Sequence, residues 1–218
     1  MKKVTTIIVS MSLLIFLSSC SSVKVANNWK DIETSNLRSK NVLVVSKTDN
    51  DVARIQFESD MVKNLSKSNV KAVESFRMYP NLNLNGDLNQ EELNQYKSDL
   101  LDIGIEIVIT NVLKDIQEYK ETAIQGSEYY VSTYPTIYYR GYRRGFYRYS
   151  NTYYVSEYPT THITSKGKKY ILETQTFDLT KPINNQLISV ITTVVDNPET
   201  MGAVSKDFSK KVINELVK

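Results

Sequence analysis

The chain has 218 residues, a length that suits one ordinary domain or one domain with an appendage. Hydrophobic residues make up 41% of the chain and charged residues 23%, which excludes a fully disordered chain and a membrane protein with many spans. A single Cys excludes a disulfide scaffold, and a single His makes a His-based metal site or catalytic triad very hard to build. We therefore expect no metal and no cofactor.

Residues 1–19 are typical of a secretory signal peptide. Lys2 and Lys3 form a basic start, and an apolar stretch follows from Val4 to Leu17. This stretch is too short and too often broken by Ser and Thr to favour a membrane span. Removal of residues 1–19 leaves a net charge of about +1, so no global field attracts nucleic acid or anionic lipid.

The segment Leu17-Ser18-Ser19-Cys20 resembles the lipobox of bacterial lipoproteins. This resemblance implies that the Cys20 sulfur accepts a diacylglyceryl group, that the signal is cut before Cys20, and that several acyl chains anchor the protein. The alternative is a plain secreted protein with a free cysteine. Ser21 stands where an Asp would resemble an inner-membrane retention signal, which favours the outer membrane. No acidic residue precedes Asp31, which favours the periplasmic face.

Residues 20–40 are polar and aperiodic, and we expect a tether whose end docks on the domain through Trp29 and Ile32. Residues 41–218 are then expected to form the folded domain. Apolar runs and helical spacing predict its first half in chain order: a strand at 41–46, a helix with N-cap candidates at 48–51 that ends near 68–69, a strand at 70–74, a loop at 75–88, a helix from 89 to 103 stopped by Gly104, and a strand from 105 to about 123. Ile103 is expected on the apolar face of the second of these helices.

The second half predicts two strands and a helix. The strands are expected at 169–178 and 187–195 with a turn at 181–185, and the last helix is expected to be capped by Asn197 with Pro198 at its first position. The apolar face of that helix is expected to carry Met201, Val204, Phe208, Val212 and Leu216. The order β-α-β-α-β-insertion-β-β-α predicts an α/β (α+β) domain of two or three layers, with a mixed β-sheet and about three helices.

This element order resembles that of small envelope α/β lipoproteins of unknown function. The resemblance rests on the lipobox, on the strand Val42-Leu43-Val44-Val45 and on the strand from Glu173-Thr174 to Phe177-Asp178. The outline is also similar to the periplasmic α/β modules of curli-secretion and penicillin-binding-protein-activator lipoproteins. The resemblance covers about residues 41–123 and 165–218, and it implies no catalytic residues.

A Tyr-rich and Arg-rich insertion at residues 127–160, here called the Tyr/Arg arm, interrupts the domain. It holds eleven of the 15 Tyr and four of the seven Arg, and residues 129–159 carry a net charge of about +3. Tyr, Val and Thr favour extended backbone, so we expect a long hairpin with arms near 129–139 and 146–157 and a tip at 141–145. Pro135 and Pro159 are expected to limit regular pairing.

Three interpretations of the Tyr/Arg arm remain open. It is a poorly ordered excursion, a binding arm, or a nucleic-acid site, and the export signal puts nucleic acid out of reach, so we expect no nucleic acid. Tyr and Arg are typical of interface hot spots, and Tyr rings stack on sugars, so the partner of a binding arm would be an envelope protein or peptidoglycan. The candidate binding surface consists of Tyr138, Tyr139, Arg140, Tyr142, Arg143, Arg144, Tyr147, Arg148 and Tyr149.

Catalytic candidates are few. His162 lies beside the Tyr/Arg arm, but a lone His is usually solvated or structural. Glu106 and Glu173 would form a carboxylate pair with split pKa values if both pointed to one face, although inward charges at a sheet edge or outward faces explain them as well. We therefore expect a lipid-anchored, non-catalytic binding or scaffolding protein of the cell envelope. The alternative is an envelope hydrolase with an unrecognised carboxylate site.

Overall fold

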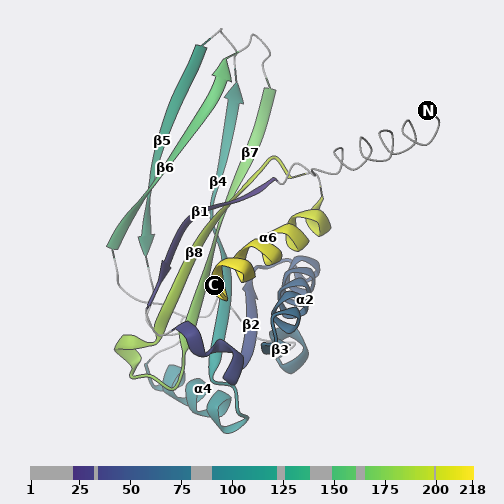
Figure 1. Ribbon diagram of the computed structural model, residues 1–218, viewed down its shortest axis with the longest axis vertical. Helices are drawn as coiled ribbons and strands as arrows, with labels where there is room; N and C mark the ends of the chain where they lie inside the picture. Colours follow the sequence, from purple (N-terminus) through teal and green to yellow (C-terminus); the bar gives the residue numbers. More distant parts are fainter. Residues whose placement is uncertain are drawn as a thin grey trace, which may run out of the picture.

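The computed structural model describes residues 22–31, 34–79, 90–121, 126–137, 149–160, 165–198 and 200–218 (Figure 1). It confirms the predicted mixed α/β fold in a single domain built on one open sheet. The predicted signal peptide, Cys20 and His162 lie outside the described residues.

The main sheet has six strands in the order β1-β8-β7-β4-β2-β3. Their bounds are β1 Val23–Lys30, β2 Asn41–Lys47, β3 Lys71–Glu74, β4 Ile107–Glu121, β7 Ser165–Asp178 and β8 Leu187–Asp196. The sheet is mixed, as predicted: β2 pairs in parallel with β3 and β4, while β4, β7, β8 and β1 pair antiparallel along the rest of the sheet.

Helices cover both faces of this sheet. Their bounds are α2 Asp51–Lys67, α3 Ser75–Met78, α4 Gln90–Asp102 and α6 Met201–Leu216, with short 3-10 helices η2 Thr34–Ser39 and η3 Ile183–Asn185. Met61 and Leu65 of α2 and Phe208 and Val212 of α6 pack in one buried cluster. Leu100 of α4 belongs to a second cluster with Val108 and Phe177. The core therefore has two halves, one on each side of the sheet.

Local signals at the helix ends explain most of the predicted boundaries. Asn50 caps α2, because its side chain accepts a hydrogen bond from the N–H of Ala53 at 3.0 Å. Gly104 ends α4 with φ of +81°, and its N–H donates to the carbonyl of Leu101 at 2.9 Å. The predicted cap within residues 48–51 and the predicted stop at Gly104 are both confirmed.

The predicted hairpin of the Tyr/Arg arm is confirmed in its backbone. Strands β5 Gly126–Ile137 and β6 Tyr149–Thr160 form a separate two-stranded antiparallel sheet, drawn beside the long ends of β4 and β7 in Figure 1. The expectation that Pro135 and Pro159 limit pairing is wrong, because the register continues through Pro135 opposite Asn151 and Pro159 opposite Ser127. The expected tip lies outside the described residues.

The prediction of a tether at residues 20–40 is wrong for most of the residues that the structure describes in this range. Val23–Lys30 forms β1, which pairs with β8 from Val23 opposite Val195 to Lys30 opposite Ser189. Val23 is fully buried, while Trp29 is 38% exposed, and Ile32 lies outside the described residues. The edge position explains the polar sequence, since one side of such a strand faces solvent.

Three smaller expectations are also wrong. The loop predicted at 75–88 begins with the short helix α3. Thr200, rather than Asn197, caps α6, because Asn197 adopts a left-handed φ of +44° and the Thr200 side chain accepts from the N–H of Ala203 at 3.2 Å. Ile103 and Met201 were expected on apolar faces, but they are 52% and 42% exposed.

Candidate functional site

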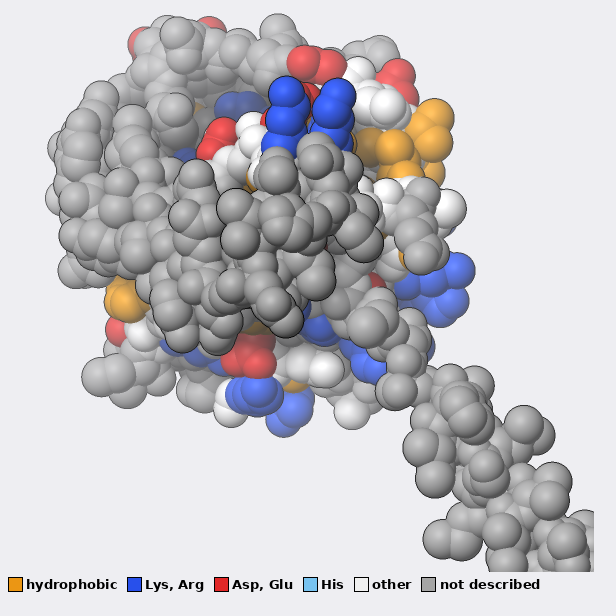
Figure 2. Space-filling model, turned by 90° about the horizontal axis from the view of Figure 1, so that it is seen from above, with side chains coloured by type: hydrophobic (Ala, Val, Ile, Leu, Met, Phe, Trp, Pro, Cys, Tyr) orange, Lys and Arg blue, Asp and Glu red, His pale blue; other side chains and the backbone are white. Residues whose placement is uncertain are grey.

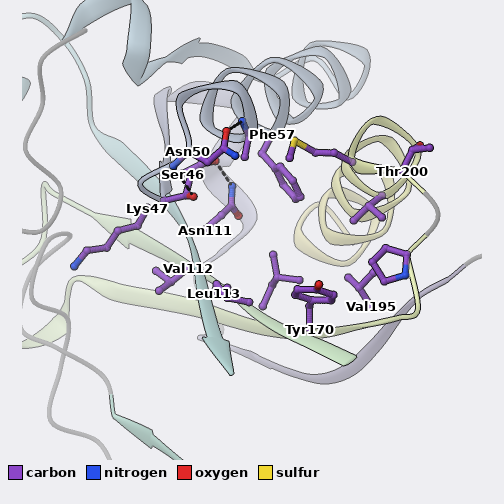
Figure 3. Close-up of a pocket in the computed structure, with 16 residues that line it drawn as sticks. Ser46, Lys47, Asn50, Phe57, Asn111, Val112, Leu113, Tyr170, Val195 and Thr200 are labelled. Atoms are coloured by element: carbon purple, nitrogen blue, oxygen red, sulfur yellow. Dashed lines mark hydrogen bonds between the residues drawn. The ribbon is translucent and has the colours of Figure 1, made fainter. Parts of the chain in front are cut away.

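A cavity of about 440 Å³ lies against the sheet where β2 ends, between the N-terminal ends of α2 and α6 (Figure 3). We call it the α2–α6 cavity. Its volume falls in the range of small-molecule sites. In open α/β sheets, ligands typically bind beyond the carboxyl ends of parallel strands, and β2 is one of the parallel strands here. The position of the cavity therefore matches the usual place of a ligand site.

Polar side chains gather at one end of the cavity, and they come from Ser46, Lys47, Thr48, Asn50 and Asn111. The turn from β2 into α2 orients several of them. The N–H of Asn50 donates to the Thr48 hydroxyl at 3.2 Å, while the Asn50 side chain caps α2. Their positions are therefore set by the fold.

A chain of buried hydrogen bonds supports this polar end. The Thr174 hydroxyl donates to Asn111 Oδ1 at 2.8 Å, and Asn111 Nδ2 donates to Ser46 Oγ at 3.4 Å, a contact drawn in Figure 3. Asn111 is only 4% exposed. Asn111 Nδ2 carries two hydrogens, and the bond to Ser46 uses one, so Asn111 keeps a second hydrogen-bond donor at this end of the cavity. An acceptor oxygen on a ligand suits this end of the cavity.

Glu58 fixes the wall behind the polar end. It is fully buried, and its carboxylate accepts hydrogen bonds from Ser46 N–H at 2.9 Å, Arg54 Nε at 3.3 Å, Ser75 Oγ at 2.7 Å and Phe76 N–H at 2.9 Å. This single side chain joins β2, α2 and α3. Its role is therefore structural, and it holds Ser46 at the edge of the cavity.

The rest of the cavity is mainly apolar, and its apolar walls come from Ala53, Phe57, Val112, Leu113, Tyr170, Leu172, Val195, Pro198, Met201 and Val204. Phe57 is held by an edge-to-face contact with Phe208, whose ring centroid lies 5.3 Å away. Leu113 remains 45% exposed. The β4–β7 register shifts directly after Leu113. The cavity thus presents apolar surface to solvent, with one hydrogen-bonding end.

A second hollow continues from the cavity toward the far ends of β4 and β7. The two share Tyr170 and Pro198, and the second is also lined by Lys120, Lys166 and Lys168. Figure 2 shows Lys and Arg side chains, together with acidic ones, on this end of the molecule. The pKa of Lys168 is raised by its hydrogen bond to Glu118, from which it lies 2.7 Å away. Glu118 also lines this hollow, which therefore holds three lysines and one glutamate beside apolar surface.

Glu173, a predicted candidate, lies on the other face of the sheet, because its neighbour Leu172 faces the cavity. Glu173 is fully buried, and its Oε1 accepts from Gln175 Nε2 at 2.6 Å and lies 3.6 Å from Lys114 Nζ. Its Oε2 has no hydrogen-bond partner within the part of the chain that the structure describes. Burial raises the pKa of Glu173, and the nearby Lys114 charge opposes that rise.

The carboxylate pair of Glu106 and Glu173 does not form, so this expectation is corrected. Glu106 lies just before β4, and its carbonyl accepts a hydrogen bond from the N–H of Leu179. Glu173 lies farther along the sheet, opposite Val112 of β4. Val112 is six positions after Glu106, which corresponds to about 20 Å along the strand. Two carboxyl groups at that separation do not share a site.

The other predicted site residues fall largely outside the described residues. These are Cys20, His162 and, from the candidate binding surface, Tyr138, Tyr139, Arg140, Tyr142, Arg143, Arg144, Tyr147 and Arg148. Tyr149 begins β6, opposite Ile137. In the described part of the chain, no group of three His, Cys, Asp or Glu side chains is placed to hold a metal ion. No described helix is long and apolar enough to cross a membrane.

Sequence reasoning missed the cavity and the role of Glu58. A signal was present for part of the site: Ser46 and Asn111 are polar residues at the points where two neighbouring buried strands lose their apolar runs. The walls from α6 and β7 come from distant parts of the chain. Their approach depends on the strand order of the sheet, which the sequence pattern does not give.

Comparisons with known proteins leave the family open. No protein-family model matches the chain, and no curated protein matches it. Among solved structures, the chain is similar to a PelC dodecamer from Paraburkholderia phytofirmans, with 10% identity, a TM-score of 0.44, and coverage of 89% of this chain and 96% of that one. A PelC variant dodecamer from the same organism gives a TM-score of 0.41 at the same identity and coverage. A likeness at these values assigns no ligand, partner or assembly to this chain.

Proposed function

We propose that this protein is a lipid-anchored, non-catalytic binding module of the cell envelope, with the α2–α6 cavity as its ligand site. The observation that carries the proposal is the cavity itself, which joins apolar walls to one hydrogen-bonding end at the carboxyl end of a parallel strand. Its ligand is an amphiphile with an apolar body and an acceptor oxygen at one end.

The surroundings of the buried carboxylates support binding over hydrolysis. Glu58 is occupied by four donors, and Asp60 joins α2 to α6 by accepting from Ser205 Oγ at 2.7 Å. Glu173 faces away from the cavity. A general acid or base needs to reach the proton that it transfers, and none of these three carboxyl groups is placed for that within the cavity.

The anchor in this proposal is Cys20, held at the outer membrane on its periplasmic side. The second hollow has three lysines against one glutamate, and this excess of positive charge suits such a position, because anionic lipid surfaces attract clustered Lys and Arg side chains. Mass spectrometry of the N-terminal peptide from envelopes tests the anchor. We expect an acylated Cys20 as the first residue and loss of membrane association in Cys20→Ala, whereas an unmodified Cys20 would overturn the anchor.

The ligand site is tested with a matched pair of variants on β4. Leu113 lines the cavity and is 45% exposed, whereas Ile116 is 48% exposed and does not line the cavity. In the unacylated Cys20→Ser chain, we expect Leu113→Arg to weaken binding of a fluorescent long-chain fatty acid at least about tenfold, since a desolvated charge costs more than 1.4 kcal/mol. Ile116→Arg should bind nearly as the parent chain, and equal binding by all three chains would refute the site.

The Tyr/Arg arm is a second contact surface in this proposal, for an envelope protein or for peptidoglycan. Its composition supports this role, since Tyr and Arg are enriched where proteins bind each other. The test is a cross-linking pull-down from intact envelopes, with residues 129–159 replaced by a short Gly/Ser linker in the comparison chain. Capture that depends on the arm supports the role, and identical capture by both chains contradicts it.

A further inference from the structure

The start of β1 lies at the edge of the α2–α6 cavity. Val23 pairs with Val195, which lines the cavity, and the carbonyl of Ser22 accepts a hydrogen bond from the N–H of Asp196 at 2.9 Å. Lys211 of α6 donates to the carbonyl of Val23. The chain therefore enters the fold beside the segment that links β8 to α6, as Figure 1 also shows.

The predicted lipid attachment point, Cys20, is separated from the start of β1 by only a few residues of chain. Cys20 precedes Ser22 by two residues, which span at most about 7 Å of extended chain. An acyl chain spans one leaflet of a bilayer core, about 15 Å. Val195 and Pro198, which lie within three residues of Asp196, both line the cavity. A lipid on Cys20 therefore reaches the cavity walls without any rearrangement of the sheet.

We infer that the α2–α6 cavity binds one acyl chain of the protein's own lipidated Cys20. The inference rests on the proposed lipid anchor and names the ligand of the proposed site. The acyl chain enters beside Val195 and Pro198, and the apolar walls of the cavity take its hydrocarbon.

Two physical arguments favour this occupant. A tethered chain acts at an effective concentration in the millimolar range, so the cavity and the chain need not be brought together by diffusion. A lipoprotein cysteine carries several acyl chains, and two buried chains suffice for stable anchoring, so one chain is able to leave the bilayer. The transfer exchanges one apolar environment for another, and the exposed Leu113 side chain gains cover.

The test places a photo-reactive phenylalanine analogue at Leu113, and in a control chain at Ile116, in cells grown with an alkyne-tagged fatty acid. After irradiation and digestion, we expect the acylated N-terminal peptide joined to the peptide containing position 113, with at least about ten times the yield seen from position 116. Equal yields from the two positions would overturn the inference. Cross-links from position 113 to a lipid not attached to Cys20 would also overturn it, because the occupant would be a membrane lipid.

The same digest separates failure of this inference from failure of the proposed function. An unmodified Cys20 peptide removes the anchor itself. An acylated Cys20 peptide that is never joined to position 113 keeps the anchor and rejects self-occupancy. A Leu113→Arg variant with normal acylation should show less protection of the cavity by the fatty acid and unchanged membrane association. A folding defect would change both readouts.

Discussion

Two fully buried glutamates on opposite sides of the sheet differ in how their charges are met. Glu58 accepts four hydrogen bonds and sits beside Arg54, whereas Glu173 has an Oε2 without a partner among the described residues and Lys114 at 3.6 Å. A buried carboxylate is costly unless it is paired and hydrogen-bonded. We therefore expect the charge of Glu58 to stabilise the fold and the charge of Glu173 to destabilise it, although both are equally buried. Burial alone does not mark either carboxylate as part of an active site.

The largest expected effect comes from Glu58→Gln. This change removes the negative charge beside the buried Arg54 and replaces one acceptor oxygen by an NH2 group, so we expect the free energy of unfolding to fall by about 3 kcal/mol. Urea unfolding of the unacylated chain measures it. Glu118→Gln, in an exposed ion pair with Lys168, serves as the control and should leave the unfolding midpoint unchanged. Similar small shifts in both variants would break the comparison.

Asp178 adds an intermediate case. Its carboxylate accepts from Lys40 Nζ at 2.6 Å, from Thr180 N–H at 3.0 Å and from Thr180 Oγ1 at 2.6 Å. Asp178→Asn should lower the free energy of unfolding by about 1.5 kcal/mol, because hydrogen bonds to a charged group are lost. Burial by itself raises the pKa of Asp178, but the hydrogen bonds from Lys40 and Thr180 hold it below its ordinary value.

The lowered pKa of Asp178 also predicts where its contribution disappears. The stabilisation is present above the ordinary Asp pKa and is lost as pH falls through the lowered pKa of the folded state. Acid unfolding followed by circular dichroism should therefore show a shallower loss of stability in Asp178→Asn than in the parent chain. Parallel acid curves for the two chains would contradict this assignment.

Glu173→Gln is expected to act in the opposite direction from Glu58→Gln. Burial outweighs Lys114 in raising the pKa of Glu173, so its ionised form is disfavoured in the folded protein. At pH 7 we expect the neutral isostere to raise the free energy of unfolding by about 1 kcal/mol. Chemical denaturation decides the sign, and a loss of stability as large as that of Glu58→Gln would remove the distinction between the two residues.

The smallest expected effect is the pH dependence of stability that comes from Glu173. A carboxyl group whose pKa is raised by folding contributes stability that is full below its unfolded pKa and is lost as pH rises through the folded pKa. The parent chain should therefore lose stability as the pH rises from the ordinary Glu pKa through the raised pKa of Glu173. The loss should be absent in Glu173→Gln, and a slope that persists in the variant would point to another group.

The sequence was sufficient to predict the elements whose patterns are local. The apolar run at Val42–Val45, the cap at Asn50 and the stop at Gly104 each carry their own signal, and β2, α2 and α4 follow from them. The edge strand β1 was missed because Asn27 and Asn28 break the alternation that marks a strand, and its pairing with β8 comes from a partner more than 150 residues away.

The candidate site was less predictable for the same reason. Glu106 and Glu173 were compared as strand residues, but their separation depends on the β4–β7 register, which only the assembled sheet determines. The α2–α6 cavity needs Ser46, Asn111 and Val204 to meet, and they come from three elements that are distant in the chain. Local pattern gives the parts of such a site, and strand order gives their arrangement.

Hydrogen exchange of the unacylated Cys20→Ser chain, with and without a long-chain fatty acid, tests most directly whether the α2–α6 cavity is the ligand site. The account predicts slower exchange in the first turns of α2 and α6 and in the peptide containing Asn111 and Leu113, with little change in β5 and β6. Protection confined to β5 and β6, or no protection anywhere, would contradict the account and return the search to the Tyr/Arg arm.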